Sequence, residues 1–197
     1  EEMAAVRREE MHRRVAELRG DRSDPEGVAI HLLQVEPRSD PAVIETLRAA
    51  AADAVGRGAP DAAVTFLRRA LTEPPRTGDE RAVVLTELGF AEIKAWTDGF
   101  DDHLEAAIAE TGDAEAAAQI AIGLGAALLF LGEADPAFRV LERALQTVDA
   151  SSPSRARLEA ELLVLGHGYP PLRPRVEALA ERRLGELAQG EPIDALL

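Results

Sequence analysis

The side chains best suited to metal binding in this sequence are its histidines, because the chain has no cysteine. They are His12, His31, His103 and His167. None belongs to an H-E-x-x-H motif or has another histidine four residues further on, the spacing that brings two imidazoles to one face of a helix. The lack of cysteine also removes disulfides, thiol catalysis and thiolate metal sites. The sequence therefore predicts no metal site.

Two histidines have neighbours that predict their surroundings. His31 lies in the apolar segment Val28–Leu33, so we expect a half-buried ring that bonds a backbone or carboxylate group. His103 lies among three acidic residues, Asp101, Asp102 and Glu105. This cluster could hold a cation weakly, but acidic side chains also favour the N-terminus of a helix. We prefer the interpretation as an acidic helix start.

Motifs for enzymatic chemistry are missing. Gly123-Leu124-Gly125 begins a dinucleotide-binding fingerprint, but Leu128 occupies the position of its third glycine and no strand precedes it. The sequence has no G-x-x-x-x-G-K-[ST] loop to hold phosphates and no G-x-S-x-G motif, and its serines cluster in the loop-like segment Ser151–Ser154. We therefore expect a protein that is not an enzyme and that binds no cofactor through this chain.

Composition predicts a helical fold and narrows the range of partners. Aromatic residues make up only 4% of the chain, so the core must consist of Leu, Ala, Val and Ile, which suits closely packed helices. The net charge of −14 repels a nucleic-acid backbone, so we expect no direct contact with nucleic acid. Lys94 is the only lysine beside many arginines, which is typical of a GC-rich, bacterial genome. No signal-peptide pattern follows Glu1, which predicts a cytoplasmic location.

Helix boundaries are marked clearly along the sequence. Aspartate precedes proline at three expected helix starts, Asp24-Pro25, Asp40-Pro41 and Asp135-Pro136, and Thr77 has capping-box spacing to Glu80. Glycines are expected at helix ends, namely Gly58, Gly99, Gly132 and Gly168. The sequence predicts helices at about 3–19, 25–35, 41–57, 61–73, 79–97, 101–110, 113–131, 135–148, 153–166 and 171–188. The apolar segment Ala116–Gly132 fits a central buried helix better than a membrane span.

A repeat organises these helices. Gly58 and Leu67 recur as Gly132 and Leu141 at an offset of 74 residues, and Leu104 falls midway between the two leucines, which gives a period of 37. Two helices per period of this size predict a solenoid. Small residues on the first helix of each copy (Ala51, Gly89 and Gly125) indicate close packing against the second helix. We predict an all-α fold, a right-handed superhelix of about three tetratricopeptide-like helix-turn-helix repeats with flanking helices.

Four segments resemble the helical middle region of large ATP-binding LuxR-type (MalT-like) transcriptional regulators, namely His31–Pro75, Val83–Ile93, Phe138–Leu145 and Arg157–Leu163. This resemblance implies that residues 1–36 form a helical connection to a missing N-terminal switch domain and that residues 37–197 form the tetratricopeptide-like repeat domain. It further implies that ATP binds only in the missing domain. The chain would then sense an effector or partner and couple that state to an ATPase switch and a DNA-binding domain outside it. The alternative is a free-standing scaffold for protein–protein interaction or self-association.

The repeat predicts which side chains line a binding groove, since solenoids expose the first helix of each pair on their concave face. The groove candidates are Glu45, Arg48, Thr86, Phe90, Lys94, Gln119 and Phe130. An arginine, the single lysine and two phenylalanines on one face suit a peptide or a small effector that carries a carboxylate. The alternative is that the helices close and bury Phe90 and Phe130 in the core. For Trp96, near a helix end, we expect a packing role.

Overall fold

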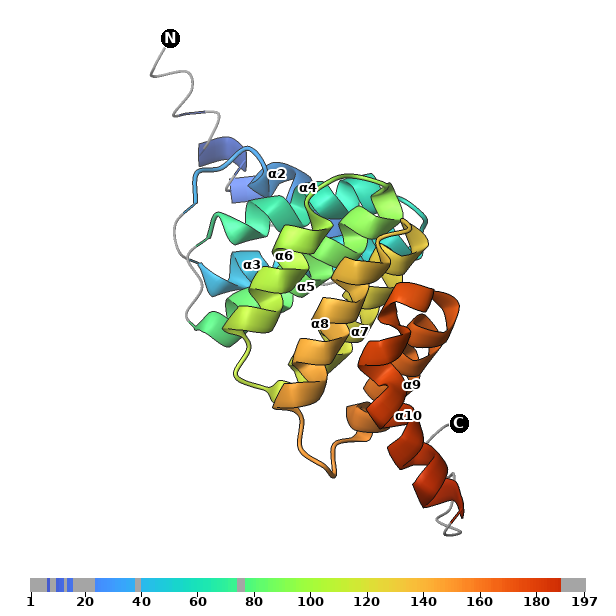
Figure 1. Ribbon diagram of the computed structural model, residues 1–197. Helices are drawn as coiled ribbons and strands as arrows, with labels where there is room; N and C mark the ends of the chain where they lie inside the picture. The colour runs from blue at the N-terminus through green and yellow to red at the C-terminus, as the bar shows by residue number, and fades with distance from the viewer. Residues whose placement is uncertain are drawn as a thin grey trace. The chain divides into compact units, whose positions relative to one another are not determined.

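The structure is a computed structural model that describes residues 7, 10–12, 14–15, 24–37, 40–73 and 77–188 (Figure 1). Every regular element in these ranges is a helix, as the composition predicts. None of the described helices is long and apolar enough to cross a membrane. Residues 3–19, where we expect a first helix, and residues 191–197 lie mostly or wholly outside the described ranges.

The chain divides into two compact units, Glu1–Glu110 and Thr111–Leu197, called here the first and the second unit. The helices of the first unit are α2 (Pro25–Leu32), α3 (Pro41–Gly56), α4 (Pro60–Leu71), α5 (Gly78–Ala95) and α6 (Phe100–Glu110). Those of the second unit are α7 (Ala114–Phe130), α8 (Ala134–Thr147), α9 (Pro153–Gly168), the short 3-10 helix η1 (Pro170–Leu172) and α10 (Arg173–Ala188). Within each unit, helices that are consecutive in sequence pack against each other (Figure 1).

Three of the four predicted capping residues begin a helix as expected. The side chains of Asp24, Asp40 and Thr77 accept hydrogen bonds from backbone N–H groups of the first turns that follow them. The prediction for Asp135 is wrong, because α8 begins one residue earlier, at Ala134, and no side chain caps it. Asp135 instead lies inside the first turn of α8, where its negative charge interacts favourably with the helix dipole.

Positive backbone φ angles mark three of the four predicted glycine turns. Gly58 (φ 77°), Gly99 (φ 101°) and Gly132 (φ 84°) each adopt a conformation that side-chain-bearing residues rarely reach. Gly168 has no positive φ, because it is still part of α9 as the last residue of that helix. The C-terminal end of α5 uses Trp96 instead, whose φ of 56° is left-handed.

The pairs α5 with α6 and α7 with α8 each pack through a glycine on the first helix. A Cβ atom on Gly89 of α5 would lie 2.5 Å from Cγ of Leu104 on α6. A Cβ on Gly125 of α7 would lie 3.0 Å from Cγ of Leu141 on α8. The helices can therefore approach this closely only because these residues lack a side chain. The repeat predicts both contacts.

The pair α9 and α10 uses the same device, although the sequence repeat leaves these helices as flanking elements. A side chain on Gly166 of α9 would overlap Val176 of α10, and Val176 is buried. The second unit therefore contains two helix pairs built in the same way, α7 with α8 and α9 with α10.

The core of the first unit includes α2, a helix of the predicted 1–36 connection. Val28, Ala29 and Leu32 of α2 belong to the same buried cluster as Leu47 of α3 and Leu67 of α4. The segment after α2 is also fixed by a hydrogen bond of 2.9 Å from Arg69 Nη2 to the carbonyl oxygen of Val35. The structure thus packs α2 as part of the first unit.

Candidate functional site

A hollow of about 330 Å³ lies on the first unit between α3 and α5. Its lining residues are Arg48, Ala51, Ala52, Val55, Leu67, Thr86, Glu87, Phe90, Ala91 and Lys94. Four of the seven predicted groove residues therefore surround one space. They are Arg48, Thr86, Phe90 and Lys94.

Helical spacing explains why these side chains meet. Arg48, Ala52 and Val55 lie three or four residues apart on α3, so they form one stripe. Thr86, Phe90 and Lys94 form the corresponding stripe on α5, at intervals of four residues. Residues that alternate with these stripes, such as Leu47 on α3 and Leu88 on α5, are fully buried in the core. The same packing that builds the unit therefore turns both stripes outward.

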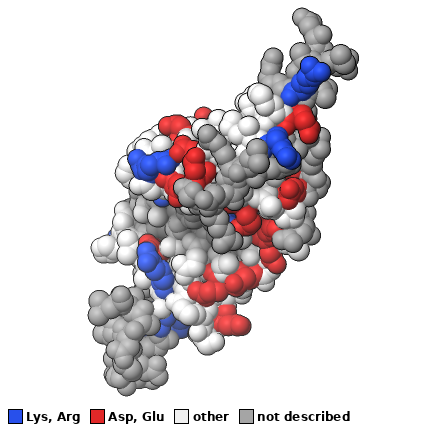
Figure 2. Space-filling view, turned by 180° about the vertical axis from the view of Figure 1, so that it is seen from behind, with Lys and Arg blue, Asp and Glu red and all other residues white. Residues whose placement is uncertain are grey.

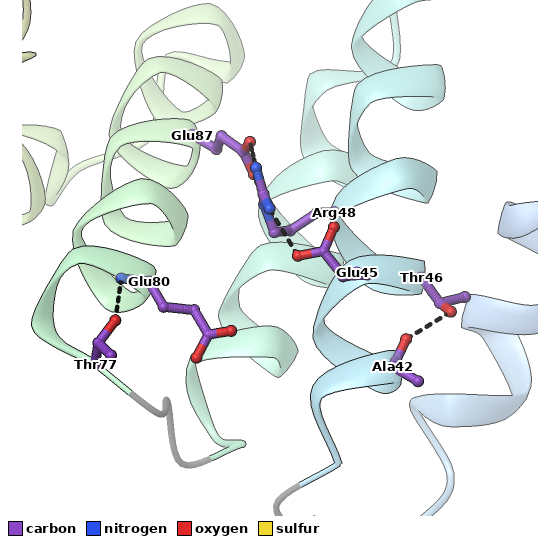
Figure 3. A network of polar contacts seen from close by, with 7 residues as sticks. All are labelled: Ala42, Glu45, Thr46, Arg48, Thr77, Glu80 and Glu87. Atoms are coloured by element: carbon purple, nitrogen blue, oxygen red, sulfur yellow. Dashed lines mark hydrogen bonds and ion pairs between the residues drawn. The ribbon is translucent and has the colours of Figure 1, made fainter.

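Arg48 is held by two carboxylates, as Figure 3 shows. Its Nε and Nη2 atoms donate to the two carboxylate oxygens of Glu87, at 2.9 and 2.6 Å, and its Nη1 atom donates to Glu45 at 2.9 Å. The hydrogen bonds to Glu87 raise the pKa of the Arg48 guanidinium above its ordinary value. This bidentate pair joins α3 to α5 across the hollow. Arg48 therefore acts mainly as a structural link, and it is less suited to clamp a ligand carboxylate than we expect from the sequence.

Lys94 and Phe90 are better placed to meet a ligand. Lys94 is exposed and makes no ion pair or hydrogen bond within the described part of the chain. Phe90 is half-buried and faces the same hollow one helical turn away. Thr86 is half-buried, and its hydroxyl donates to the carbonyl oxygen of Ala82 in its own helix. The hollow thus combines an ammonium group with an aromatic surface.

The remaining groove candidates lie elsewhere. Glu45 is exposed beside Arg48 and does not line the hollow. Gln119 and Phe130 are on α7, which belongs to the second unit. Phe130 is 75% exposed, so the alternative in which Phe90 and Phe130 form core is wrong for Phe130. Phe90 lies between the two interpretations, with part of its ring in the hollow.

A buried polar cluster in the first unit changes the interpretation of His103. Glu92 of α5 is 0% exposed. Its carboxylate accepts a 2.9 Å hydrogen bond from Arg68 Nη2 on α4 and lies 2.8 Å from Nδ1 of His103 on α6. His103 therefore does more than lie in an acidic helix start. Through the Glu92 carboxylate it takes part in a contact that joins α4, α5 and α6. The apolar neighbours of Glu92 in the sequence give no signal for this cluster.

The second unit has a related link between α7 and α9. Glu115 of α7 accepts hydrogen bonds from the hydroxyls of Ser152, at 2.5 Å, and Ser154. Gln119 Nε2 donates to Ser154 Oγ at 2.5 Å, and Ser154 is buried. The hydrogen bonds from the two serine hydroxyls lower the pKa of the Glu115 carboxyl, and the one from Ser152 is the largest cause. The serines expected in a loop therefore help to fix the start of α9.

Two further predictions are corrected by the side-chain positions. His31 is half-buried as expected, but the partner that the described residues give it is another histidine, because its Nδ1 atom lies 2.9 Å from Nδ1 of His12. Trp96 is 76% exposed at the left-handed end of α5, so the predicted packing role is wrong. Among the described residues, no group of three or more His, Asp or Glu side chains is arranged to hold a metal ion.

Comparisons with known proteins agree with the helix pairing. The fold is that of tetratricopeptide-like helical repeat proteins. The crystal structure of MamA protein superposes with a TM-score of 0.58 at 20% sequence identity, over 94% of this chain and 96% of that chain. This likeness concerns the fold alone. No protein-family model matches the sequence, and no curated protein matches it. The resemblance to LuxR-type regulators therefore stays a prediction from the sequence.

Proposed function

We propose that this chain is a protein-interaction module of the tetratricopeptide-like kind and that the hollow between α3 and α5 receives a segment of a partner protein. The observation that carries the proposal is the shared position of Lys94 and Phe90 around one hollow of about 330 Å³. An aromatic surface next to a cationic group suits an apolar side chain followed by an acidic group. The interaction role is the alternative that the sequence leaves open, and the fold comparison supports it better than the regulator role.

The size of the hollow favours a few side chains of an extended segment. A hollow of about 330 Å³ accommodates one or two side chains of the partner. Affinity would then depend on Phe90 and Lys94 more than on contact area.

Peptide selection tests this proposal even while the partner is unidentified. A random peptide library selected on the whole chain, with counter-selection on the Ala52→Trp variant, should enrich peptides that combine an apolar and an acidic residue. Ala52 is exposed and lines the hollow, so tryptophan there fills the space without entering the core. Binding that is equally tight to the wild type and to Ala52→Trp would contradict the proposal.

The matched control for this substitution is Ala49→Trp. Ala49 is exposed on the same helix and does not line the hollow. Its substitution should leave the affinity for the selected peptides unchanged. Light scattering of the unliganded chain tests the competing possibility that the same face binds a second copy of the chain.

A further inference from the structure

A second hollow, of about 450 Å³, lies on the second unit among α8, α9 and α10. Its base is apolar, because Phe138, Leu162 and Val176 line it and are buried. Leu145 and Leu179 line it as well and are half-buried. This space uses α8 and α10, the second helices of two successive pairs, whereas the proposed partner site lies between the first helices of its pairs. It is therefore a different kind of surface from the hollow between α3 and α5.

Basic side chains surround the apolar base. Arg155, Arg175 and Arg182 line the hollow, and among the described residues Glu142 is the one acidic side chain that lines it. The whole chain carries a net charge of −14, and basic side chains form small separate groups on the face shown in Figure 2. A local excess of arginine over acid thus contrasts with the general charge of the protein. It favours an anionic occupant.

A buried carboxylate fixes two of these arginines in place. Glu159 of α9 is 2% exposed. It accepts a hydrogen bond of 2.8 Å from Arg182 Nη2 and another from Arg183, and it lies 3.4 Å from Nε of Arg155. Three guanidinium groups around one carboxylate leave a positive surplus at the edge of the hollow. The surplus is held in position because the carboxylate is part of the core of the unit.

Arg175 crosses the hollow from α10 to α8. Its Nη2 atom donates to Glu142 at 2.5 Å, and its guanidinium carbon lies 4.2 Å from the centre of the Phe138 ring. Its other N–H groups make no hydrogen bond to the described part of the chain. A ligand whose apolar part rests near Phe138 would therefore bring its polar end to Arg175.

We infer that this second hollow binds a small anionic amphiphile, a molecule with an apolar body and a carboxylate head. The apolar body would cover the half-buried Leu145 and Leu179 above the buried base, and the carboxylate would accept hydrogen bonds from Arg175, whose planar donors match its geometry. The volume of about 450 Å³ lies in the usual range for small-molecule sites. A small molecule is accordingly the occupant that fits both the volume and the charge.

Octanoate is a suitable probe, with octan-1-ol and octylammonium as the neutral and cationic comparisons. We expect octanoate to bind saturably at neutral pH and to shift the backbone amide signals of α8, α9 and α10 in the whole chain. Octan-1-ol should bind at least about tenfold more weakly, because it cannot form charge-assisted hydrogen bonds with arginine. Octylammonium should bind more weakly still. No saturable shift with octanoate, or equal affinity for all three probes, would overturn the inference.

Substitutions separate the role of charge from that of shape. Arg175→Gln should weaken octanoate binding about tenfold, whereas Arg157→Gln, an exposed arginine of α9 that does not line the hollow, should leave it unchanged. Ala178→Trp should abolish binding, because Ala178 is exposed and lines the hollow. Thermal unfolding verifies that each variant is folded. Unchanged octanoate affinity in both Arg175→Gln and Ala178→Trp would place the ligand elsewhere and overturn the inference.

Discussion

Gly89 of α5 lies so close to Leu104 of α6 that a methyl group at residue 89 would stand 2.5 Å from the leucine Cγ atom. Gly125 and Leu141 repeat this relationship in α7 and α8 at 3.0 Å. The sequence repeat thus corresponds to a repeated packing contact, in which a glycine of one helix faces a buried leucine of the next. At both glycines an added side chain would therefore meet the facing leucine, and more severely at Gly89 than at Gly125.

Gly89→Ala should therefore destabilise the protein, although alanine is the better helix former. Alanine in a helix gains about 1 kcal/mol over glycine, but the overlap with Leu104 and with the Phe100 carbonyl oxygen costs about 1–3 kcal/mol. Gly125→Ala should be close to neutral, because Leu141 needs to move by only a few tenths of an ångström. Urea unfolding of the wild type, Gly89→Ala and Gly125→Ala measures these differences in the free energy of unfolding.

Gly185→Ala is the matched control, because nothing lies within 4 Å of a Cβ built on Gly185 in α10. This substitution should raise the free energy of unfolding by about 0.5–1 kcal/mol. If Gly89→Ala were stabilising by a similar amount, α5 and α6 would not pack as closely as described.

The repeat predicts most of the fold, and its failures have physical reasons. The spacing of Leu67, Leu104 and Leu141 is enough to predict three helix pairs, because all three leucines are buried, and Leu104 and Leu141 each lie against a glycine of the preceding helix. The pairing of α9 with α10 does not follow from this spacing. There Val176 takes the place of leucine, and the proline-containing η1 changes the interval.

Glu92→Ala should cost about 2–4 kcal/mol of unfolding free energy, because the carboxylate accepts from Arg68 and meets His103 in a fully buried position. The substitution also leaves a cavity where α4, α5 and α6 meet. Asp53→Ala, at an exposed position of α3, should change stability by less than about 0.5 kcal/mol. Equal effects of the two substitutions, in thermal or urea unfolding, would contradict the clustered arrangement.

Acidification should weaken the link between α7 and α9. The pKa of Glu115 is lowered in the folded state from its ordinary value of 4.5 by the hydroxyls of Ser152 and Ser154. A lowered folded-state pKa means that the stabilisation is complete above pH 4.5 and is lost as the pH falls through the folded-state pKa. Glu115→Gln should therefore be less stable than the wild type at pH 7, and the difference should shrink at pH values well below 4.5.

Ser152→Ala tests the cause of this pH dependence, since Ser152 makes the largest contribution to the lowered pKa of Glu115. In the Ser152→Ala background, Glu115→Gln should lower the free energy of unfolding at pH 7 by less than it does in the wild type. Ser151→Ala, an exposed neighbour, should leave this loss unchanged. Urea unfolding curves at neutral and acidic pH give the comparison. If the loss of unfolding free energy in Glu115→Gln stayed constant with pH, the hydrogen bonds from the serine hydroxyls could not be its cause.

Glu87→Gln should increase the affinity for an acidic peptide selected on the hollow between α3 and α5. The substitution removes the negative charge that engages Arg48, so the hollow becomes more positive. A single charge at this partly exposed site corresponds to about a two- to fivefold change in affinity. Lys94→Gln should lower the affinity by a similar factor. Titration calorimetry with the selected peptide measures both, and a lower affinity of Glu87→Gln would contradict the assigned charge balance.

The candidate site could be predicted from the sequence only in part. Helical spacing is sufficient to bring Thr86, Phe90 and Lys94 to one face of α5 and Arg48 to the facing side of α3. Arg48 and Glu87 are 39 residues apart in sequence, and their hydrogen bonds depend on how far the two side chains reach between α3 and α5. The periodicity of the sequence does not predict such a contact. Polar clusters such as the one around Glu92 escape prediction for the same reason.

Amide chemical shifts of the whole chain, recorded on addition of a peptide selected on the wild type against Ala52→Trp, test the central claim most directly. We predict that the largest changes fall on residues 48–55 of α3 and 86–94 of α5, and that Ala52→Trp abolishes them while Ala49→Trp does not. Changes confined to the second unit, or to the exposed Thr65 and Arg68 of α4, would contradict the assignment of the hollow between α3 and α5 as the partner site.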